Sequence, residues 1–205
     1  MKSPKILIVY YSMYGHMFEM VKQVKAGVEA AGGTVVLRRV AELVPEKFLD
    51  EYARQAAEAQ KDIEVADPRA DLKDIDGVIV GTPTRFGNMA AQVKNFWDQT
   101  GGDWAKGTLV GKPAGVITST ATQHGGQEST ILATHTVLLH HGCVLVGMPY
   151  SIQEQTTLEG LEGGSPYGPG TITGGKGERF PSDLEKKMAR DFGAHFTGIA
   201  ARLQP

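Results

Sequence analysis

Short apolar runs alternate with longer segments of helical periodicity along most of the chain. The runs are Lys5–Tyr11, Thr34–Val40, Val78–Gly81, Ala114–Thr118 and Cys143–Gly147. Nearly continuous runs of Val, Ile, Leu and small residues are typical of strands that are buried on both faces of a parallel sheet. The second run ends in two arginines, which favours a position at the edge of the sheet.

The segments between the runs predict helices. They cover Val21–Ala31, Met89–Thr100, Glu128–His141 and Ser182–Leu203. Gly-Gly pairs follow the first two and predict their ends. The last begins with Ser182 and has Glu185 three residues later, which is the pattern of a capping box.

Strands that alternate with helices predict an α/β fold, a doubly wound three-layer sandwich with right-handed crossovers. Five strands suit the flavodoxin-like order 2-1-3-4-5, with helices on both faces of a parallel sheet. Two segments exceed this pattern, and we interpret them as insertions in a single domain over residues 1–205. One is 45–68, with a helix expected over Glu46–Gln60, and the other is 151–179, rich in Gly, Pro, Ser and Thr.

Composition narrows the function classes. The chain has 205 residues and a net charge of −2, which is typical neither of a nucleic-acid-binding surface nor of a protein that binds anionic membranes. Its only cysteine, Cys143, lies in an apolar run and is expected to be buried. No apolar run is long enough to span a bilayer, and the N-terminus lacks a signal-peptide pattern, so we expect a cytoplasmic protein. The six histidines show no metal-ligand spacing, and we expect no metal.

The loops that follow the strands hold the candidate chemistry, because ligands of this architecture bind at the carboxyl ends of the strands. The first loop, Ser12–Met17, matches neither the triphosphate loop nor the dinucleotide fingerprint. Its Gly15, its backbone N–H groups and the Ser12 hydroxyl precede a helix, which suits one phosphate. An ordinary strand-to-helix turn with a serine cap is an equally good interpretation of this loop alone.

Two further loops are candidates for binding a flat heterocycle. Thr84, Arg85 and Phe86 follow the third run, and Arg85 near the polar edge of a ring would stabilise negative charge on reduction. The alternatives are a surface ion pair for Arg85 and a core contact for Phe86. The loop from Ser119 to Glu128 is rich in hydroxyl groups and glycine, so it either closes over the same ring or is a mobile surface loop.

Several motifs together resemble a known family. They are YYSMYGH, GTPTRFGNM, DQTGG, GGQE, HHG and GGSPYG, and they extend from the first strand almost to the C-terminal helix. The chain resembles the NAD(P)H:quinone oxidoreductases that were first named tryptophan-repressor-binding proteins. The resemblance implies a flavodoxin-like fold, bound FMN, a homotetramer, and two-electron reduction of quinones by NADH or NADPH.

The resemblance also implies roles for individual residues. Arg85 and His140 match family positions at the flavin, where we expect them to assist the reaction, and Tyr14 and Trp104 match contacts to the nicotinamide nucleotide and the substrate. The chain departs from the family pattern at Ala121–His124, where the family has more glycine and one residue fewer. The expected FMN-binding residues are Ser12, Met13, Tyr14, Gly15, His16, Met17, Thr84, Arg85, Phe86, Ser119, Thr120, Ala121, Thr122, Gln123, His124 and His140.

Two alternative functions remain at this stage. A flavodoxin-type carrier of single electrons predicts a strongly acidic surface, which the near-neutral net charge does not favour. A non-enzymatic regulatory partner of a DNA-bound repressor, as the older family name suggests, finds no basic or groove-reading segment in the sequence. The leading hypothesis is therefore hydride transfer through flavin N5 with ping-pong kinetics.

Overall fold

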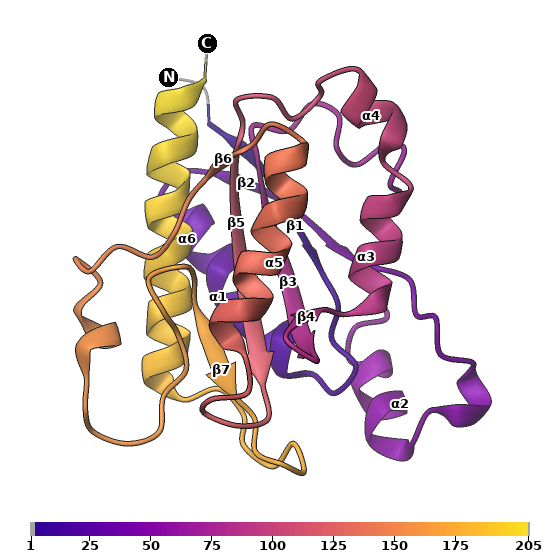
Figure 1. Cartoon of the computed structure of the whole chain (residues 1–205), viewed down its shortest axis with the longest axis vertical. Coiled ribbons are helices and arrows are strands. Elements are labelled where there is room, and N and C mark those ends of the chain that lie inside the picture. Colours follow the sequence, from indigo (N-terminus) through magenta and orange to yellow (C-terminus); the bar gives the residue numbers. More distant parts are fainter. Residues whose placement is uncertain (1–2, 205) are drawn as a thin grey trace.

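A mainly parallel β-sheet runs through the centre of the computed structural model, which describes residues 3–204 (Figure 1). Its strands are β1 (Lys5–Tyr10), β2 (Thr34–Arg39), β3 (Gly77–Arg85), β4 (Asn88–Met89), β5 (Pro113–Thr120), β6 (Val144–Leu145) and β7 (Gly170–Ile172). The main path of the sheet is β2-β1-β3-β5-β6, with β4 beside β3 and β7 beside β5. The flavodoxin-like α/β class and the edge position of β2 are therefore confirmed.

The predicted number of strands was wrong, because the sheet contains seven strands and not five. The five predicted strands keep their expected relative order. The strand β4 forms an antiparallel hairpin with the end of β3. Both β6 and β7 pair in parallel with β5, β6 at Pro113–Ala114 and β7 at Thr118–Thr120. The segment from 146 to 169 therefore interrupts the fifth strand position, and β7 resumes it.

Helices cover both faces of the sheet (Figure 1). They are α1 (His16–Ala30), α2 (Glu51–Glu58), α3 (Ala91–Asp98), α4 (Gly101–Ala105), α5 (Gln127–His140) and α6 (Asp183–Leu203), with 3₁₀ turns η1 (Glu46–Phe48) and η2 (Gln153–Thr156). Alternate β1 residues face opposite cores: Leu7 and Val9 pack with α3 and α5, whereas Ile6 and Ile8 pack with α1 and α6. Burial of these two apolar layers holds the three-layer arrangement together.

Helices α1 and α6 approach each other closely because glycines face each other at the crossing. A Cβ on Gly27 would lie 1.9 Å from the Arg190 carbonyl oxygen, and one on Gly193 would lie 2.3 Å from the Val24 carbonyl oxygen. The predicted capping box of α6 is confirmed: Ser182 Oγ accepts from the Glu185 N–H, and the Glu185 carboxylate accepts from the Ser182 N–H. Cys143 is buried, as expected.

Two predicted helices differ from the structure. The helix expected over Glu46–Gln60 is divided into η1 and α2, because Asp50 leaves the helical conformation and its carboxylate caps α2 by accepting from the Ala53 N–H. The Gly101-Gly102 pair does not end the helical region, since α4 begins there after α3. Within the described residues, no helix combines the length and apolarity needed to cross a membrane.

Candidate functional site

Four loops converge at the carboxyl end of the sheet, the lower end in Figure 1. They follow β1, β3, β5 and β7, and hydrogen bonds join them. Thr130 Oγ1, at the start of α5, donates to Thr84 Oγ1 at 2.7 Å. The Thr173 N–H donates to the Thr120 carbonyl at 2.8 Å, and the His16 ring bonds the Gly177 carbonyl at 3.0 Å. The sequence located the first three loops. The fourth lies in the segment 151–179, which the sequence singled out only as an insertion, because the strand before the loop has only three residues.

The loop after β1 forms a row of N–H groups at the start of α1. Gly15 adopts a φ of 90° at the N-cap, a conformation that favours glycine. In the described part of the chain, no intramolecular acceptor faces the backbone N–H groups of residues 13 to 17. Ser12 Oγ accepts from the Phe18 N–H at 3.1 Å, so its own proton remains available for donation. Unpaired N–H groups at a helix N-terminus favour an anion.

His16 fastens this loop to the loop after β7. The imidazole is 7% exposed and stacks on Phe180 with 4.7 Å between ring centroids. Because the Gly177 carbonyl can only accept, Nε2 carries the proton in the neutral ring. Burial lowers the pKa of His16, and the bond to Gly177 opposes that shift. The neutral side chain therefore connects two loops, while its backbone N–H belongs to the row of N–H groups without an acceptor in the described part of the chain.

The end of β3 turns back into β4 through Phe86 and Gly87. Both residues have positive φ, 54° and 77°, which is the pattern of a type I′ hairpin turn. Phenylalanine is a strained choice there, since such turns favour Asn, Asp or Gly. Its side chain is fully exposed, so the alternative that Phe86 makes a core contact is wrong. Arg85 is also exposed, and its Nη1 donates to the Thr84 carbonyl at 2.9 Å.

The third loop divides into a buried start and an exposed tip. Ser119 and Thr120 end β5 and are buried, whereas Ala121, Thr122, Gln123 and His124 are exposed. Thr120 Oγ1 donates to the Thr122 carbonyl at 2.8 Å and accepts from Gln127 Nε2 at 3.2 Å. The buried hydroxyls therefore fix the base of the loop, and its tip projects from the same edge of the sheet.

A buried polar network supports the third and fourth loops. Gln127 bonds Thr120, the Thr171 carbonyl and the Gly164 N–H. The carboxylate of Glu185 is 0% exposed and accepts from Thr171 Oγ1 at 2.7 Å and from Arg179 Nη1 at 2.9 Å. Sequence reasoning assigned no supporting role to Gln127 and treated Glu185 only as a cap. The GGQE motif was the one available signal for Gln127.

Trp104 and His140 lie at the other end of the sheet. Trp104 belongs to α4, not to a loop, and its Nε1 donates to the His140 carbonyl at 2.9 Å. These two residues border a cleft of about 310 Å³ that Lys94, Trp97, Asp98, Thr100, Gly101, Val137 and His141 also line. Helix α5 begins at the loops and ends at His140, and 14 helical residues span roughly 20 Å. A single chain therefore does not bring Trp104 and His140 to the four loops.

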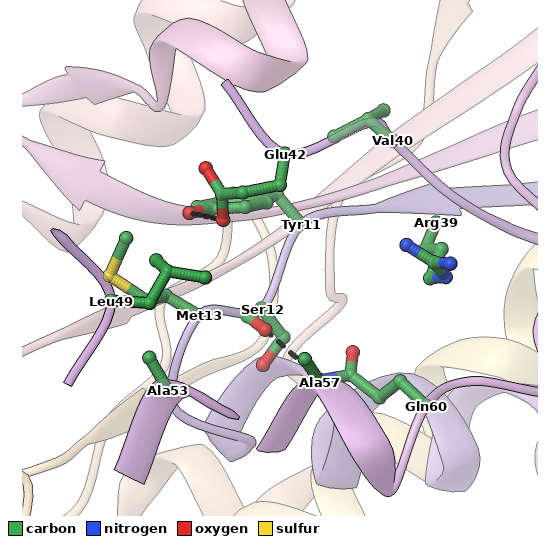
Figure 2. Close-up of a pocket in the computed structure, with 10 residues that line it drawn as sticks. All are labelled: Tyr11, Ser12, Met13, Arg39, Val40, Glu42, Leu49, Ala53, Ala57 and Gln60. Atoms are coloured by element: carbon green, nitrogen blue, oxygen red, sulfur yellow. Dashed lines mark hydrogen bonds between the residues drawn. The ribbon is translucent and has the colours of Figure 1, made fainter. Parts of the chain in front are cut away.

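A small cavity of about 80 Å³ lies behind the loop after β1, between that loop and α2 (Figure 2). Tyr11 and Glu42 lie side by side on its wall, and the Tyr11 hydroxyl donates to Glu42 Oε2 at 2.6 Å. Gln92 Nε2 donates to Glu42 Oε1 at 2.7 Å. These bonds join the loops after β1 and β2 to the first turn of α3. Partial burial raises the pKa of Glu42, but these hydrogen bonds outweigh burial and lower it. A separate contact joins the loop to the N-cap of α2, where the Tyr14 hydroxyl donates to Asp50 Oδ2 at 3.4 Å.

The hydrogen-bond donors of the loop after β1 fit the single phosphate of a flavin mononucleotide better than a triphosphate. Five successive N–H groups and one hydroxyl match a single phosphate, and no lysine or arginine lies in residues 12–17. Phe86, Arg85 and loop 121–124 are exposed at the same end of the sheet, where they would offer aromatic and polar partners to a flat ring. No cluster of three or more metal-binding side chains occurs among the described residues.

Residues 4–157 match the family model for NADPH-dependent FMN reductases. The chain is 53% identical to an NAD(P)H dehydrogenase (quinone) of Aromatoleum aromaticum, with 97% of each chain covered. It is also 53% identical to the enzyme of that name in Geobacter sulfurreducens, covering 97% of this chain and 98% of the relative. The chain belongs to the NAD(P)H:quinone oxidoreductase family.

Solved structures agree with the fold of this oxidoreductase family member. A WrbA-like flavodoxin from Agrobacterium tumefaciens aligns with a TM-score of 0.66 at 23% identity, covering 98% of this chain and all of the other. An archaeal flavodoxin aligns with a TM-score of 0.62 at 14% identity, covering 96% and 99%. The flavodoxin-like arrangement is thus shared with proteins of low sequence identity, so the family assignment depends on the quinone dehydrogenase relatives.

Proposed function

We propose that this chain binds FMN and uses it to reduce quinones to hydroquinones, with NADH or NADPH as the electron donor. One observation carries the proposal: at the start of α1, where four loops converge, a row of N–H groups has no acceptor within residues 3–204. The relatives named NAD(P)H dehydrogenase (quinone) support the same activity, because they are about half identical over nearly the full chain.

The loop after β1 holds the phosphate in this proposal. The N–H groups of residues 13 to 17 and the Ser12 hydroxyl donate to its oxygens, and the positive end of the α1 dipole favours the dianion. The turn at Gly15 lets the backbone approach the ligand closely. Because no side-chain cation is needed, binding depends on the direction of the N–H groups.

The loops after β3 and β5 hold the ring. When bound there, FMN supplies the redox chemistry, since it accepts a hydride at N5 and delivers two electrons to a quinone. Thr84, Arg85 and Phe86 contact one side of the ring, and Ser119 to His124 close over another. The Arg85 guanidinium and nearby N–H groups stabilise negative charge on the reduced ring. Tyr14 contacts the nicotinamide nucleotide.

Both substrates use one pocket, so the reaction is ping-pong. The oxidised nicotinamide nucleotide leaves before the quinone enters, and double-reciprocal plots are then parallel. Lines that intersect would show that both substrates bind together and would contradict this part of the proposal.

We further propose that residues 1–205 form one domain that assembles into a homotetramer. Trp104 and His140 then complete the pocket from a second copy, because they lie far from the loops of their own chain. Exposed apolar side chains near that end support a subunit contact: Trp104, Val110, Leu139 and Val144 are all at least 43% exposed. The segments 45–68 and 151–179 are insertions within this domain.

An anaerobic titration tests the activity directly. Apoprotein is loaded with FMN, NADH or NADPH is added, and the flavin absorbance is followed before and after benzoquinone. We expect bleaching without a semiquinone band, and then reoxidation by the quinone. Bound FMN that does not bleach would instead indicate an electron carrier. Absence of FMN binding would contradict the assignment of the loop after β1.

A further inference from the structure

The buried amide of Gln60 connects α2 to the candidate phosphate loop. Gln60 lies just after the end of α2 and is 4% exposed. Its Nε2 donates to the Ser12 carbonyl at 3.1 Å (Figure 2). It also donates to the Ala56 carbonyl at 2.7 Å, which uses both amide protons. The Ala56 bond is local to the helix, whereas the Ser12 bond joins residues 48 positions apart.

The bond to Ser12 sets the direction of the next N–H group. In a trans peptide the carbonyl and the following N–H point in opposite directions. The Ser12 carbonyl points toward Gln60, and the described residues contain no cis peptide. The Met13 N–H therefore points away from α2, and it is the first of the N–H groups that have no acceptor in the described part of the chain.

A cavity borders Ser12 and Met13 on the side of α2. The cavity between α2 and the loop is about 80 Å³, and two small residues of α2, Ala53 and Ala57, line it. A peptide beside such a space can rotate unless a hydrogen bond fixes it. The only other side-chain bond between α2 with its N-cap and the loop, within residues 3–204, runs from the Tyr14 hydroxyl to Asp50 Oδ2. That bond is 3.4 Å long and acts on a side chain, so it does not orient the Ser12–Met13 peptide.

We propose that Gln60 is a positioning residue for the cofactor phosphate. It holds the Ser12–Met13 peptide so that the Met13 N–H points into the phosphate site. This inference rests on the proposed function, since it assigns the phosphate of FMN to the loop after β1. It also gives the inserted helix α2 a role, which is to keep the phosphate loop in its binding conformation before the cofactor arrives.

Comparison of FMN with riboflavin tests the inference, because riboflavin has the same ring and lacks the phosphate. Binding of each flavin to apoprotein is measured by the quenching of flavin fluorescence. Gln60→Met keeps the length of the side chain and removes both donors, and we expect FMN binding to weaken about tenfold. In Gln60→Glu a carboxylate faces the Ser12 carbonyl, so we expect about a hundredfold weakening. Riboflavin binding should change less than about twofold in both.

Gln55→Glu is the matched control. Gln55 lies in α2 and is exposed, and its side chain bonds only Glu51 among the described residues, so this variant makes the same chemical change without touching the loop. FMN binding should be unaffected by it. The unfolding free energy of each apoprotein is measured by urea denaturation. If a variant does not fold, Gln60→Asn replaces it, because asparagine keeps the amide on a shorter side chain.

The outcomes separate this inference from the proposed function. Weaker FMN binding with unchanged riboflavin binding supports a positioning role. Equal weakening for both flavins shows that Gln60 only supports the fold, and unchanged FMN binding shows that the Ser12 bond is dispensable; either result overturns the inference and leaves the proposed function intact. Wild-type protein that binds neither flavin would overturn both.

Discussion

The two ends of the sheet differ in how their polar groups are satisfied. At the carboxyl end, the buried side chains of Gln127 and Glu185 are fully bonded, and backbone N–H groups at the start of α1 have no acceptor among the described residues. At the amino end, Trp97 Nε1 and His141 Nδ1 are buried without a hydrogen-bond partner among the described residues. Trp104 next to them is 58% exposed.

This difference indicates two kinds of binding surface. At the carboxyl end a buried hydrogen-bond network supports the loops, which suits a small anionic ligand that must find its donors already in place. The amino end is aromatic and open, and its unpaired groups are costly in an isolated chain. The backbone donors of the first surface therefore come from one chain, whereas the second surface is consistent with cover by another copy.

Removal of the Glu185 carboxylate should have the largest effect on stability, because this group supports the loops at the carboxyl end of the sheet. Glu185→Ala leaves Thr171, Arg179 and the Gly163 N–H without their buried acceptor. We expect a loss of about 3–5 kcal/mol in the unfolding free energy of the apoprotein, measured by urea denaturation. Glu154→Ala is the control, because Glu154 forms a surface ion pair with Lys187 and should cost at most about 1 kcal/mol. Equal losses would mean that the network does not support the loops.

Mixed oligomers should show whether the two ends meet in one pocket. We expect Arg85→Ala and Trp104→Ala each to lower kcat/KM about tenfold, because each removes one wall of the proposed site. The two variants are co-expressed with different tags, and oligomers that carry both are purified. If the ends come from different copies, about one quarter of the sites regain both residues, and activity rises above either parent.

The control for mixing uses two variants at the same end. In a mixture of Trp104→Ala and His140→Ala chains, every chain lacks one of the two residues. No chain can then contribute both residues to a site, so activity should not recover. A lack of recovery in the Arg85 and Trp104 mixture as well would argue against a pocket shared between copies.

Much of the fold was predictable because buried parallel strands have a strong sequence signal. The continuous apolar residues of β1 and β3, together with the predicted cap at Ser182, located the main elements correctly. The strands β4 and β7 gave no such signal, since two or three residues in glycine-containing segments show no periodicity. Asp50 appeared within a helical pattern, and only the structure shows that it caps α2.

The site was predictable only in part, for a physical reason. The rule that ligands bind at the carboxyl ends of strands identified the loops after β1, β3 and β5. Gln60, Gln127 and Glu185 look like ordinary polar helix residues in the sequence, because their partners are up to 48 positions away. The family resemblance pointed to Trp104 and His140, but nothing in the sequence indicates which end of the sheet they occupy.

The smallest expected effect concerns the turn at Phe86, where stability and function should change in opposite directions. Its φ of 54° is strained for phenylalanine, and the exposed ring has no packing to offset that strain. Phe86→Asn should therefore stabilise the apoprotein by about 1 kcal/mol in urea denaturation, because asparagine tolerates this conformation. The same variant should lower kcat/KM for quinones, since it removes the aromatic wall. Phe48→Asn, also exposed but without positive φ, should leave both quantities nearly unchanged. If Phe86→Asn destabilised the protein, the turn would not be strained. Strain at an exposed ring would then no longer support a functional role for Phe86 at this end of the sheet.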